Sequence, residues 1–246
     1  MPHRLSKSRF VAGVQCHKLL WWRVHDSNAV ELQPDKVLQD RFDQGAHVGT
    51  LARGTFPGGV LIDLPHKAVD ERVKLTRKLI DDGAPAIFEA SFLADNTFVA
   101  VDILTPQEGG YHLTEVKSSS SQKEEHLSDA AVQVHVLSRS GIHITGVDVM
   151  HLNKECHFPD LSNLFERTDV TAAVQPLLGK VGWEIDRTSC YGAMTFWTLA
   201  GLFRALVTGK RASSESAPRL SLDMPRVAAL SVKRCKSIEP DWPDND

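Results

Sequence analysis

The sequence predicts an α/β fold in which a mixed central sheet is flanked by helices. Three strand-like segments follow one another at 86–92, 98–104 and 111–117, separated only by short turns. A helical pattern at 67–82 precedes them, and a further helix and strand follow. The order αβββαβ indicates an antiparallel meander that a returning strand extends, with helices packed against the sheet.

The individual elements rest on apolar periodicity and on residues that begin or end helices. Ser6 is an N-cap candidate for the first helix. Gly83 and Gly141 lie where two later helical patterns end. A glycine there readily adopts the left-handed backbone conformation that ends a helix. Asp95-Asn96 and the segment from Pro106 to Gly110 are predicted turns. The predicted helices are 6–24, 38–53, 67–82 and 125–140, and the last predicted strand is 142–152.

Beyond residue 155 the periodicity weakens. Helices are predicted over 160–180 and 190–208, and Ser, Arg, Pro and Lys dominate afterwards. We therefore divide the chain into a core with N-terminal helices, a helical C-terminal extension and a basic tail of low order. The three parts span 1–155, 156–207 and 208–246.

The composition and the distribution of charge limit which partners the chain is expected to bind. The chain has 246 residues and a net charge of -3, which does not favour unspecific binding of nucleic acid by the whole molecule. Positive charge is nevertheless concentrated before Asp26 and again from Arg204 to Lys236. These stretches are either phosphate-binding faces or ordinary solvated surface. The first contains Arg4, Lys7, Arg9, Lys18 and Arg23.

Two further expectations concern the compartment. No apolar run approaches the roughly 20 residues that span a bilayer, and the basic N-terminus does not resemble a signal peptide. We expect a cytoplasmic protein that does not insert into a membrane. In that compartment dispersed cysteines are typically thiols rather than disulfides. The chain has Cys16, Cys156, Cys190 and Cys235.

The strongest chemical signal lies on the second and third predicted strands. Glu115 and Lys117 are two residues apart, so both side chains point to one face of their strand. Asp102 interrupts an apolar strand, where a carboxylate is costly unless it is paired or metal-bound. Asp102, Glu115 and the Val116 carbonyl are oxygen donors suited to Mg²⁺ or Mn²⁺. Lys117 would then orient or deprotonate a water molecule, or stabilise charge developing on phosphorus.

A plainer interpretation exists for each residue. A Glu-x-Lys pair on a strand is usually an exposed salt bridge that contributes little. Glu89, on the strand before Asp102, is either a further carboxylate of the site or a surface glutamate.

Further motifs flank these strands in a fixed order. They are Leu5-Ser6-Lys7-Ser8-Arg9-Phe10, Gln15 to Trp22, Phe42 to Arg53, Ala84 to Ala90, and Glu115-Val116-Lys117 to Lys123 followed by His126, Asp129, Ala130, Gln133 and Val136-Leu137. Together they resemble the RecB-like branch of the PD-(D/E)XK nucleases, specifically a bacterial domain-of-unknown-function family related to the CRISPR-associated RecB-like exonucleases. The resemblance covers residues 4–153.

The resemblance implies a restriction-endonuclease-like core and a role for each site residue. Asp102 and Glu115 would be metal ligands, with Lys117 as the catalytic lysine. Gln133 would match the glutamine that contacts the site or DNA, and Glu89 an additional acidic residue.

The chain departs from its relatives in two features. Many relatives have a histidine ligand in a Gly-x-x-x-His pattern, but Gly49 stands in that place here and His47 lies two residues earlier. Several relatives bind a 4Fe-4S cluster through one N-terminal and three clustered C-terminal cysteines. Cys16 matches the first, whereas Cys190 and Cys235 are too far apart, so we do not expect a cluster.

The leading functional hypothesis is a metal-dependent deoxyribonuclease that acts on single-stranded DNA or duplex ends. DNA would approach along the basic N-terminal helix, and Trp21 and Trp22 would either stack on bases or pack in the core. The alternatives are a non-catalytic nucleic-acid-binding or scaffold module with the same fold, and a nuclease that acts on RNA.

Overall fold

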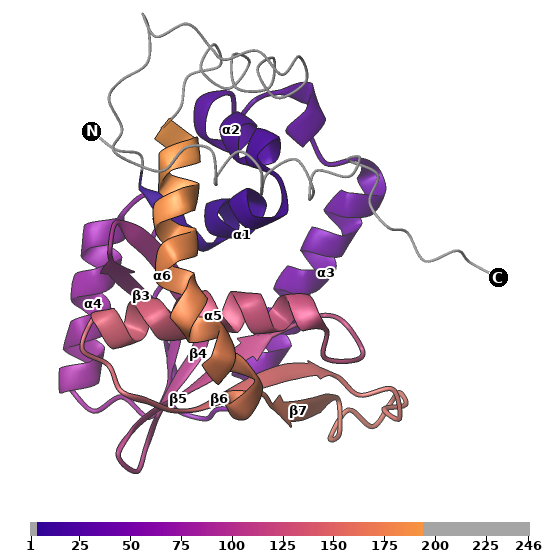
Figure 1. The fold of residues 1–246 in the computed structure, drawn as a ribbon. Helices are drawn as coiled ribbons and strands as arrows, with labels where there is room; N and C mark the ends of the chain where they lie inside the picture. Colours follow the sequence, from indigo (N-terminus) through magenta and orange to yellow (C-terminus); the bar gives the residue numbers. More distant parts are fainter. Residues whose placement is uncertain (1–3, 194–246) are drawn as a thin grey trace, which may run out of the picture.

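The computed structural model describes residues 4–193, which form a mixed α/β structure (Figure 1). The elements follow the predicted order through the core of the chain. They are β1 (Leu5–Ser6), α1 (Lys7–Gln15), α2 (His17–His25), the 3-10 helix η1 (Val30–Leu32), α3 (Lys36–Arg53), β2 (Val60–Leu61), α4 (Val69–Asp81), β3 (Ile87–Ala94), β4 (Thr97–Gln107), β5 (Gly110–Val116), α5 (Glu124–Arg139), β6 (Ile144–Leu152), β7 (Phe165–Asp169) and α6 (Thr171–Ala193).

One sheet organises these elements. Its strands lie in the order β2-β3-β4-β5-β6-β7, and β1 pairs with β4 beside this path. The meander β3-β4-β5 is antiparallel, as the sequence predicts. β6 returns parallel to β5, and β7 adds an antiparallel edge.

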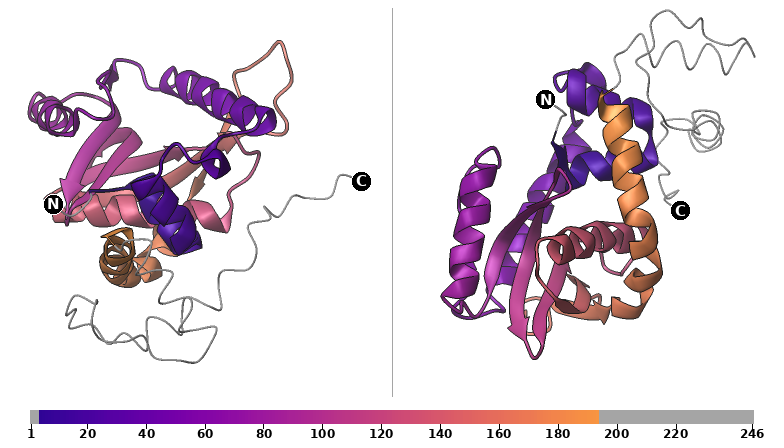
Figure 2. Two further views of the ribbon diagram at one scale, coloured as in Figure 1. Left: turned by 90° about the horizontal axis from the view of Figure 1, so that it is seen from above. Right: turned by 60° about the vertical axis from the view of Figure 1, so that its left-hand side comes forward.

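Helices cover both faces of the sheet. Figure 2 shows α3 and α4 on one face, and α1, α5 and α6 on the other. The main core lies beneath α5, where Ala130, Val134 and Leu137 are buried with Val101 and Leu113 of the sheet. A smaller cluster on the α3 side contains Ala52, Phe88, Ile103 and Met150. None of the described helices combines the length and the apolar character that crossing a membrane requires.

The predicted N-terminal helix is two helices. Ser6 caps α1 as expected, because its side chain accepts a hydrogen bond from the Arg9 amide at 3.3 Å. Cys16 has extended backbone angles (φ -157°, ψ 119°), which ends α1 and starts α2. The single helix over 6–24 is therefore a wrong prediction, because apolar periodicity alone does not register a one-residue break between two helices.

Two other predictions need correction. Pro106 still pairs with Tyr111, so β4 and β5 continue to a tighter turn at Glu108-Gly109. The helix predicted over 160–180 is wrong at its start, because 165–169 is the edge strand β7. Its Glu, Arg, Thr and Asp residues resemble a polar helix, and pairing with β6 overrides that preference.

Most of the helix predicted over 190–208 lies outside the described residues, as do the basic tail over 208–246 and Cys235. Within 156–193, α6 is helical as expected. Among the described residues, Cys16, Cys156 and Cys190 form no disulfide with one another.

Candidate active site at the strand fork

The site residues gather where β4 and β5 separate. The two strands pair from Gln107–Gly110 to Ile103–Thr114. β5 pairs with β6 from Tyr111 to Val116, so past its last pair with β4 it continues along β6 alone, with Glu115 beside Val149. Asp102 and Glu115 are the next residues on each strand, so the fork places both carboxylates at one point of the sheet.

The Asp102 side chain connects β4 to β5 at the point where their backbones no longer pair. Its Oδ2 accepts a hydrogen bond from the Val116 amide at 2.7 Å, in place of a backbone acceptor from β4. Burial and the nearby Glu115 carboxylate raise the pKa of Asp102 to about 7, against the opposing effects of Lys7 and the Val116 amide. A carboxylate that is destabilised by a neighbouring carboxylate favours a bound cation.

Glu115 is the most heavily contacted carboxylate of the site. It is 2% exposed. Lys7 Nζ lies 2.9 and 3.2 Å from its two oxygens, Lys117 Nζ lies 2.9 Å from Oε1, and Gln133 Nε2 donates to Oε2 at 2.7 Å. Burial alone would raise the pKa of Glu115, but Lys7, Lys117 and Gln133 lower it well below its usual range.

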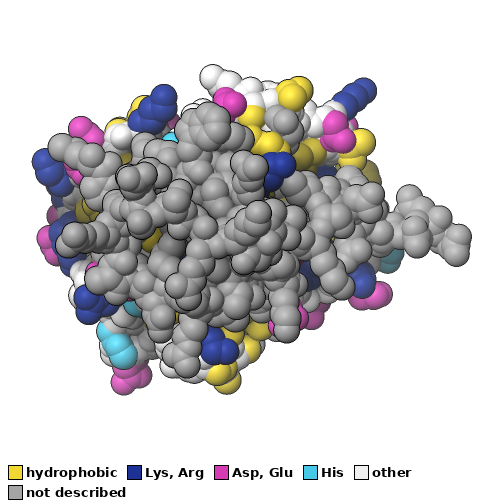
Figure 3. Space-filling model, turned by 45° about the horizontal axis from the view of Figure 1, so that its top comes forward, with side chains coloured by type: hydrophobic (Ala, Val, Ile, Leu, Met, Phe, Trp, Pro, Cys, Tyr) yellow, Lys and Arg dark blue, Asp and Glu magenta, His cyan; other side chains and the backbone are white. Residues whose placement is uncertain are grey.

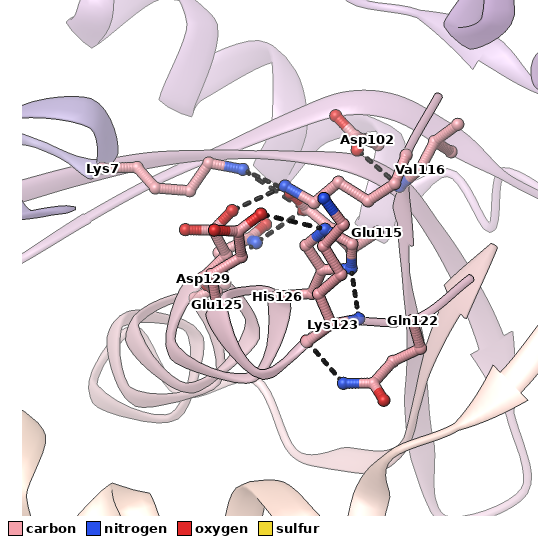
Figure 4. A network of polar contacts seen from close by, with 11 residues as sticks. Lys7, Asp102, Glu115, Val116, Gln122, Lys123, Glu125, His126 and Asp129 are labelled. Carbon is pink, nitrogen blue, oxygen red and sulfur yellow. Dashed lines mark hydrogen bonds and ion pairs between the residues drawn. The ribbon is translucent and has the colours of Figure 1, made fainter. Parts of the chain in front are cut away.

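Lys117 bridges two carboxylates, those of Glu115 and Asp129, which Figure 4 labels within the surrounding network of polar contacts. Besides Glu115, its Nζ contacts Asp129 Oδ2 on α5 at 2.6 Å. Burial lowers the pKa of Lys117, yet Glu115 and Asp129 outweigh burial and raise it. The side chain is therefore an ammonium at neutral pH.

Gln133 occupies the position that the sequence predicts. It lies on α5, is completely buried, and donates both to Glu115 and to the Asp129 carbonyl, the latter at 3.1 Å. Its Oε1 is buried and has no hydrogen-bond partner among the residues that the structure describes.

Two arginines contact the carboxylate of Glu89 and hold it in position. Arg53 of α3 lies 3.3 Å from Oε1, and Arg72 of α4 lies 3.6 Å from Oε2. Arg72 is 2% exposed and also donates to the Glu89 carbonyl at 3.2 Å and to Ser91 Oγ at 3.0 Å. Glu89 has φ +59° within β3, a left-handed conformation that is rare for a non-glycine residue. It is thus a constrained, half-buried residue rather than a plain surface glutamate.

A small cavity of about 120 Å³ opens beside Asp102 on the α3 side of the sheet. Small residues of α3 line one side of the cavity. A Cβ atom added at Gly45 or Gly49 would meet no other atom within 4 Å, so the space beside these glycines is open. Its lining consists of Gly45, Ala46, Gly49, Arg53, Glu89, Asp102, Ile103 and Val116. Asp102 and Glu89 therefore share a space that admits a hydrated ion or a phosphate oxygen.

The structure does not bring every candidate to this cavity. His47 is exposed on α3 and is absent from the lining, whereas Gly49 is part of it. Among the described residues, no three His, Cys, Asp or Glu side chains are grouped as a ready metal site. Cys16 lies at the junction of α1 and α2, partly buried.

Much of the N-terminal positive charge is used within the molecule. Lys7 faces Glu115, Arg9 donates to the carbonyls of Arg4 and Arg23, and Arg4 pairs with Asp70 at 3.6 Å. Around the margin of the face in Figure 3, basic side chains lie beside acidic ones among the described residues. A continuous basic face along the N-terminal helix is therefore a weaker expectation than the sequence suggests.

The two tryptophans contact residues of their own helix. The Trp21 ring stacks on His25 with centroids 5.2 Å apart, and Lys18 Nζ lies 4.6 Å from the centroid of the Trp22 ring. Both side chains are partly exposed.

Four residues of the site were not assigned roles from the sequence. Lys7 appeared in a basic stretch and in the N-terminal motif of the resemblance, and Asp129 only in a family motif, without a role for either side chain. Arg53 and Arg72 lie on helices whose sequence gives no sign of a contact with Glu89. A buried arginine in an amphipathic helix is a detectable anomaly only once the buried face of that helix is known.

Comparisons with known proteins give little guidance. No family model matches the chain, and no curated protein matches it. Among solved structures, the chain is similar to one described as "Crystal structure of SSO0001", with a TM-score of 0.37 and 10% identity over 74% of this chain and 76% of that one. A likeness at this level carries no argument about function.

Proposed function

We propose that the protein is a metal-dependent nuclease with a restriction-endonuclease-like core of the PD-(D/E)XK type, and that it hydrolyses phosphodiester bonds of DNA. The observation that carries the proposal is the fork of β4 and β5, where Asp102 and Glu115 are adjacent and Lys117 contacts Glu115. This arrangement supports the proposal, because Asp102 comes from β4 whereas Glu115 and Lys117 come from β5 and the residue after it.

The donor atoms suit a hard divalent cation. Asp102 and Glu89 offer carboxylate oxygens in the lining of the cavity, together with Val116, whose carbonyl is a further candidate. Glu115 is not part of that lining and would add an oxygen from the fork, where Lys7, Lys117 and Gln133 contact it. The raised pKa of Asp102 beside Glu115 is the electrostatic sign of two carboxylates that a cation would stabilise together. Mg²⁺ or Mn²⁺ bound there would polarise a phosphate oxygen and lower the pKa of a bound water.

Lys117 would act as a cation. Its raised pKa leaves no neutral amine at neutral pH, which disfavours the role of general base. Held between Glu115 and Asp129, the ammonium would instead orient the attacking water and stabilise negative charge as it develops on the phosphate. Gln133 would keep Glu115 in place from α5.

One observation favours a second candidate, a nucleic-acid-binding or scaffold module without catalysis. Lys7, Lys117 and Gln133 already satisfy Glu115 without a metal ion. A site of this kind stabilises the fold through buried ion pairs and needs no cation.

A cleavage assay separates the two candidates. The full-length protein is incubated with linear duplex DNA, single-stranded DNA and RNA in Mg²⁺, Mn²⁺ or EDTA. The proposal predicts DNA cleavage that EDTA abolishes and that Lys117→Met reduces by about 10²-fold or more, since a preorganised charge at the reacting phosphate contributes roughly that much.

The matched control for this assay is Lys74→Met, an exposed lysine of α4. It makes the same change of charge on a helix that packs on β3 and is expected to cleave like the wild type. Cleavage that persists in EDTA would refute the metal mechanism, and cleavage of RNA alone would refute the assignment of DNA.

A further inference from the structure

Lys7 enters the site from a distant part of the chain. It is the first residue of α1, 108 residues before Glu115, and its side chain is 25% exposed. Figure 4 shows it reaching toward Glu115 from the side opposite Val116. The contact with both oxygens of Glu115, at 2.9 and 3.2 Å, makes Lys7 part of the fork.

The backbone around Lys7 is fixed. Leu5 and Ser6 pair with Thr97 and Phe98 of β4, and Ser6 caps the helix that Lys7 begins. Leu5 and Phe10 on either side are each 3% exposed. The ammonium is therefore held at the fork by the fold and is not a flexible surface group that happens to reach it.

The charges at the fork show why a second lysine matters. Lys117 already contacts Glu115 and Asp129, so one lysine serves both of these carboxylates. Lys7 contacts Glu115 and no second carboxylate among the residues that the structure describes. A divalent cation on Glu115 would therefore compete with Lys7 for that carboxylate, whereas Lys117 would keep its contact with Asp129.

We propose that Lys7 is a substrate-binding residue, whose ammonium contacts a phosphate of the bound nucleic acid once Glu115 is engaged by a cation. This inference rests on the proposed function and names the anion that completes the site. Glu115 is the carboxylate that Lys7 contacts among the described residues, so a cation on Glu115 leaves the Lys7 charge available for a phosphate. A single ammonium can serve as a point-charge phosphate contact without the paired geometry of an arginine.

Binding and turnover are measured on the full-length protein with Lys7→Met and Lys7→Arg. Fluorescence anisotropy follows a labelled single-stranded oligonucleotide in Ca²⁺, and calorimetry follows Mn²⁺ binding without nucleic acid. We expect Lys7→Met to weaken oligonucleotide binding about tenfold, the usual effect of losing one charge-assisted contact. Lys7→Met should also raise KM more than it lowers kcat. Its Mn²⁺ affinity should equal or exceed that of the wild type. Lys7→Arg should restore most of the oligonucleotide affinity.

The matched control is Lys74→Met, which removes an exposed lysine of α4, outside the N-terminal basic stretch. It is expected to change oligonucleotide binding less than twofold. If Lys7→Met binds the oligonucleotide like the wild type and loses only melting temperature, Lys7 is a structural ion-pair partner and the inference fails. An equal loss in both variants would also overturn it, because the effect would then be one of general charge.

The inference and the proposed function fail separately. A wild type that cleaves DNA, with an unchanged Lys7→Met variant, refutes the role of Lys7 alone. A wild type that cleaves no nucleic acid, but whose oligonucleotide binding depends on Lys7 and not on Lys74, refutes the nuclease and supports the phosphate contact.

Discussion

At the scale of single residues, Glu89 stores backbone strain beside the cavity. Its φ of +59° brings the Cβ atom of a normal residue close to the backbone, which costs roughly 1–2 kcal/mol. Arg72 compensates by binding both the Glu89 carbonyl and its carboxylate. Strain of this kind tends to persist at sites where a side chain must point in a required direction.

Comparing Glu89→Gly with Glu89→Ala isolates this strain. Both variants lose the carboxylate and the contacts with Arg53 and Arg72, but only glycine adopts a positive φ without cost. We expect the glycine variant to have a free energy of unfolding about 1 kcal/mol higher than the alanine variant, measured by urea denaturation. Equal stability, or a more stable alanine variant, would contradict a strained Glu89.

The residues that the sequence could predict are those whose environment is local. Asp102 stood out because it interrupts an apolar strand, and Glu115 and Lys117 because alternate residues share a face. Gln133 came from the resemblance. Lys7 and Arg72 could not be predicted, because their partners lie 108 and 17 residues away and only the packed fold brings them together.

At the scale of elements, the close approach of α1 and α6 depends on Gly13. A Cβ atom there would lie 2.3 Å from Thr188 Cγ2, and the Thr188 side chain is completely buried. A side chain at this position would therefore force Thr188 or one of the two helices to shift.

Gly13→Ala should lower the free energy of unfolding by about 1–2 kcal/mol, because the added methyl group overpacks a tight contact. Gly179→Ala is the control, since a Cβ atom there meets nothing within 4 Å. That exposed helical position should gain about 0.5–1 kcal/mol from the better helix propensity of alanine. Urea denaturation measures both variants, and a stabilised Gly13→Ala would show that the contact is looser than described.

The packing of α2 on α6 is expected to be sensitive to acid. Burial and the nearby Arg187 charge lower the pKa of His17 from its usual 6.5 to about 4. Between these values the unfolded chain binds the proton and the folded chain does not. The contribution of neutral His17 to the free energy of unfolding is therefore fully present above about pH 6.5, and it is lost as the pH drops toward 4.

His17→Gln should flatten this part of the profile of melting temperature against pH. His157→Gln, at an exposed position, is the control and should follow the wild type. If His17→Gln declines as steeply as the wild type between pH 6.5 and 4, the acid sensitivity arises elsewhere.

The elements that the sequence predicted well have strong local signals. The three strands of the meander and the helix α5 lie within a few residues of their expected bounds. The break at Cys16 and the strand β7 were missed for a physical reason. A helix interruption of one residue leaves the apolar pattern almost intact, and an edge strand with polar residues owes its conformation to its neighbour β6.

At the scale of the whole molecule, the candidate site joins segments that are far apart in the chain. Lys7 comes from α1, Glu89 from β3, Asp102 from β4, Lys117 from the end of β5, and Gln133 from α5. α6 packs on α1, α2 and α5, so the segment after residue 155 supports the helices that carry part of the site. The site thus depends on the folded chain from its first helix to at least α6.

The central claim is that the carboxylates at the strand fork bind a divalent cation, and calorimetric titration with Mn²⁺ tests it most directly. Asp102→Asn keeps an oxygen to accept the Val116 amide and removes the charge. We predict that the wild type binds Mn²⁺ and that Asp102→Asn binds it at least about tenfold more weakly, a loss of roughly 1.4 kcal/mol. Equal binding by the two proteins, or no binding by the wild type, would contradict the claim.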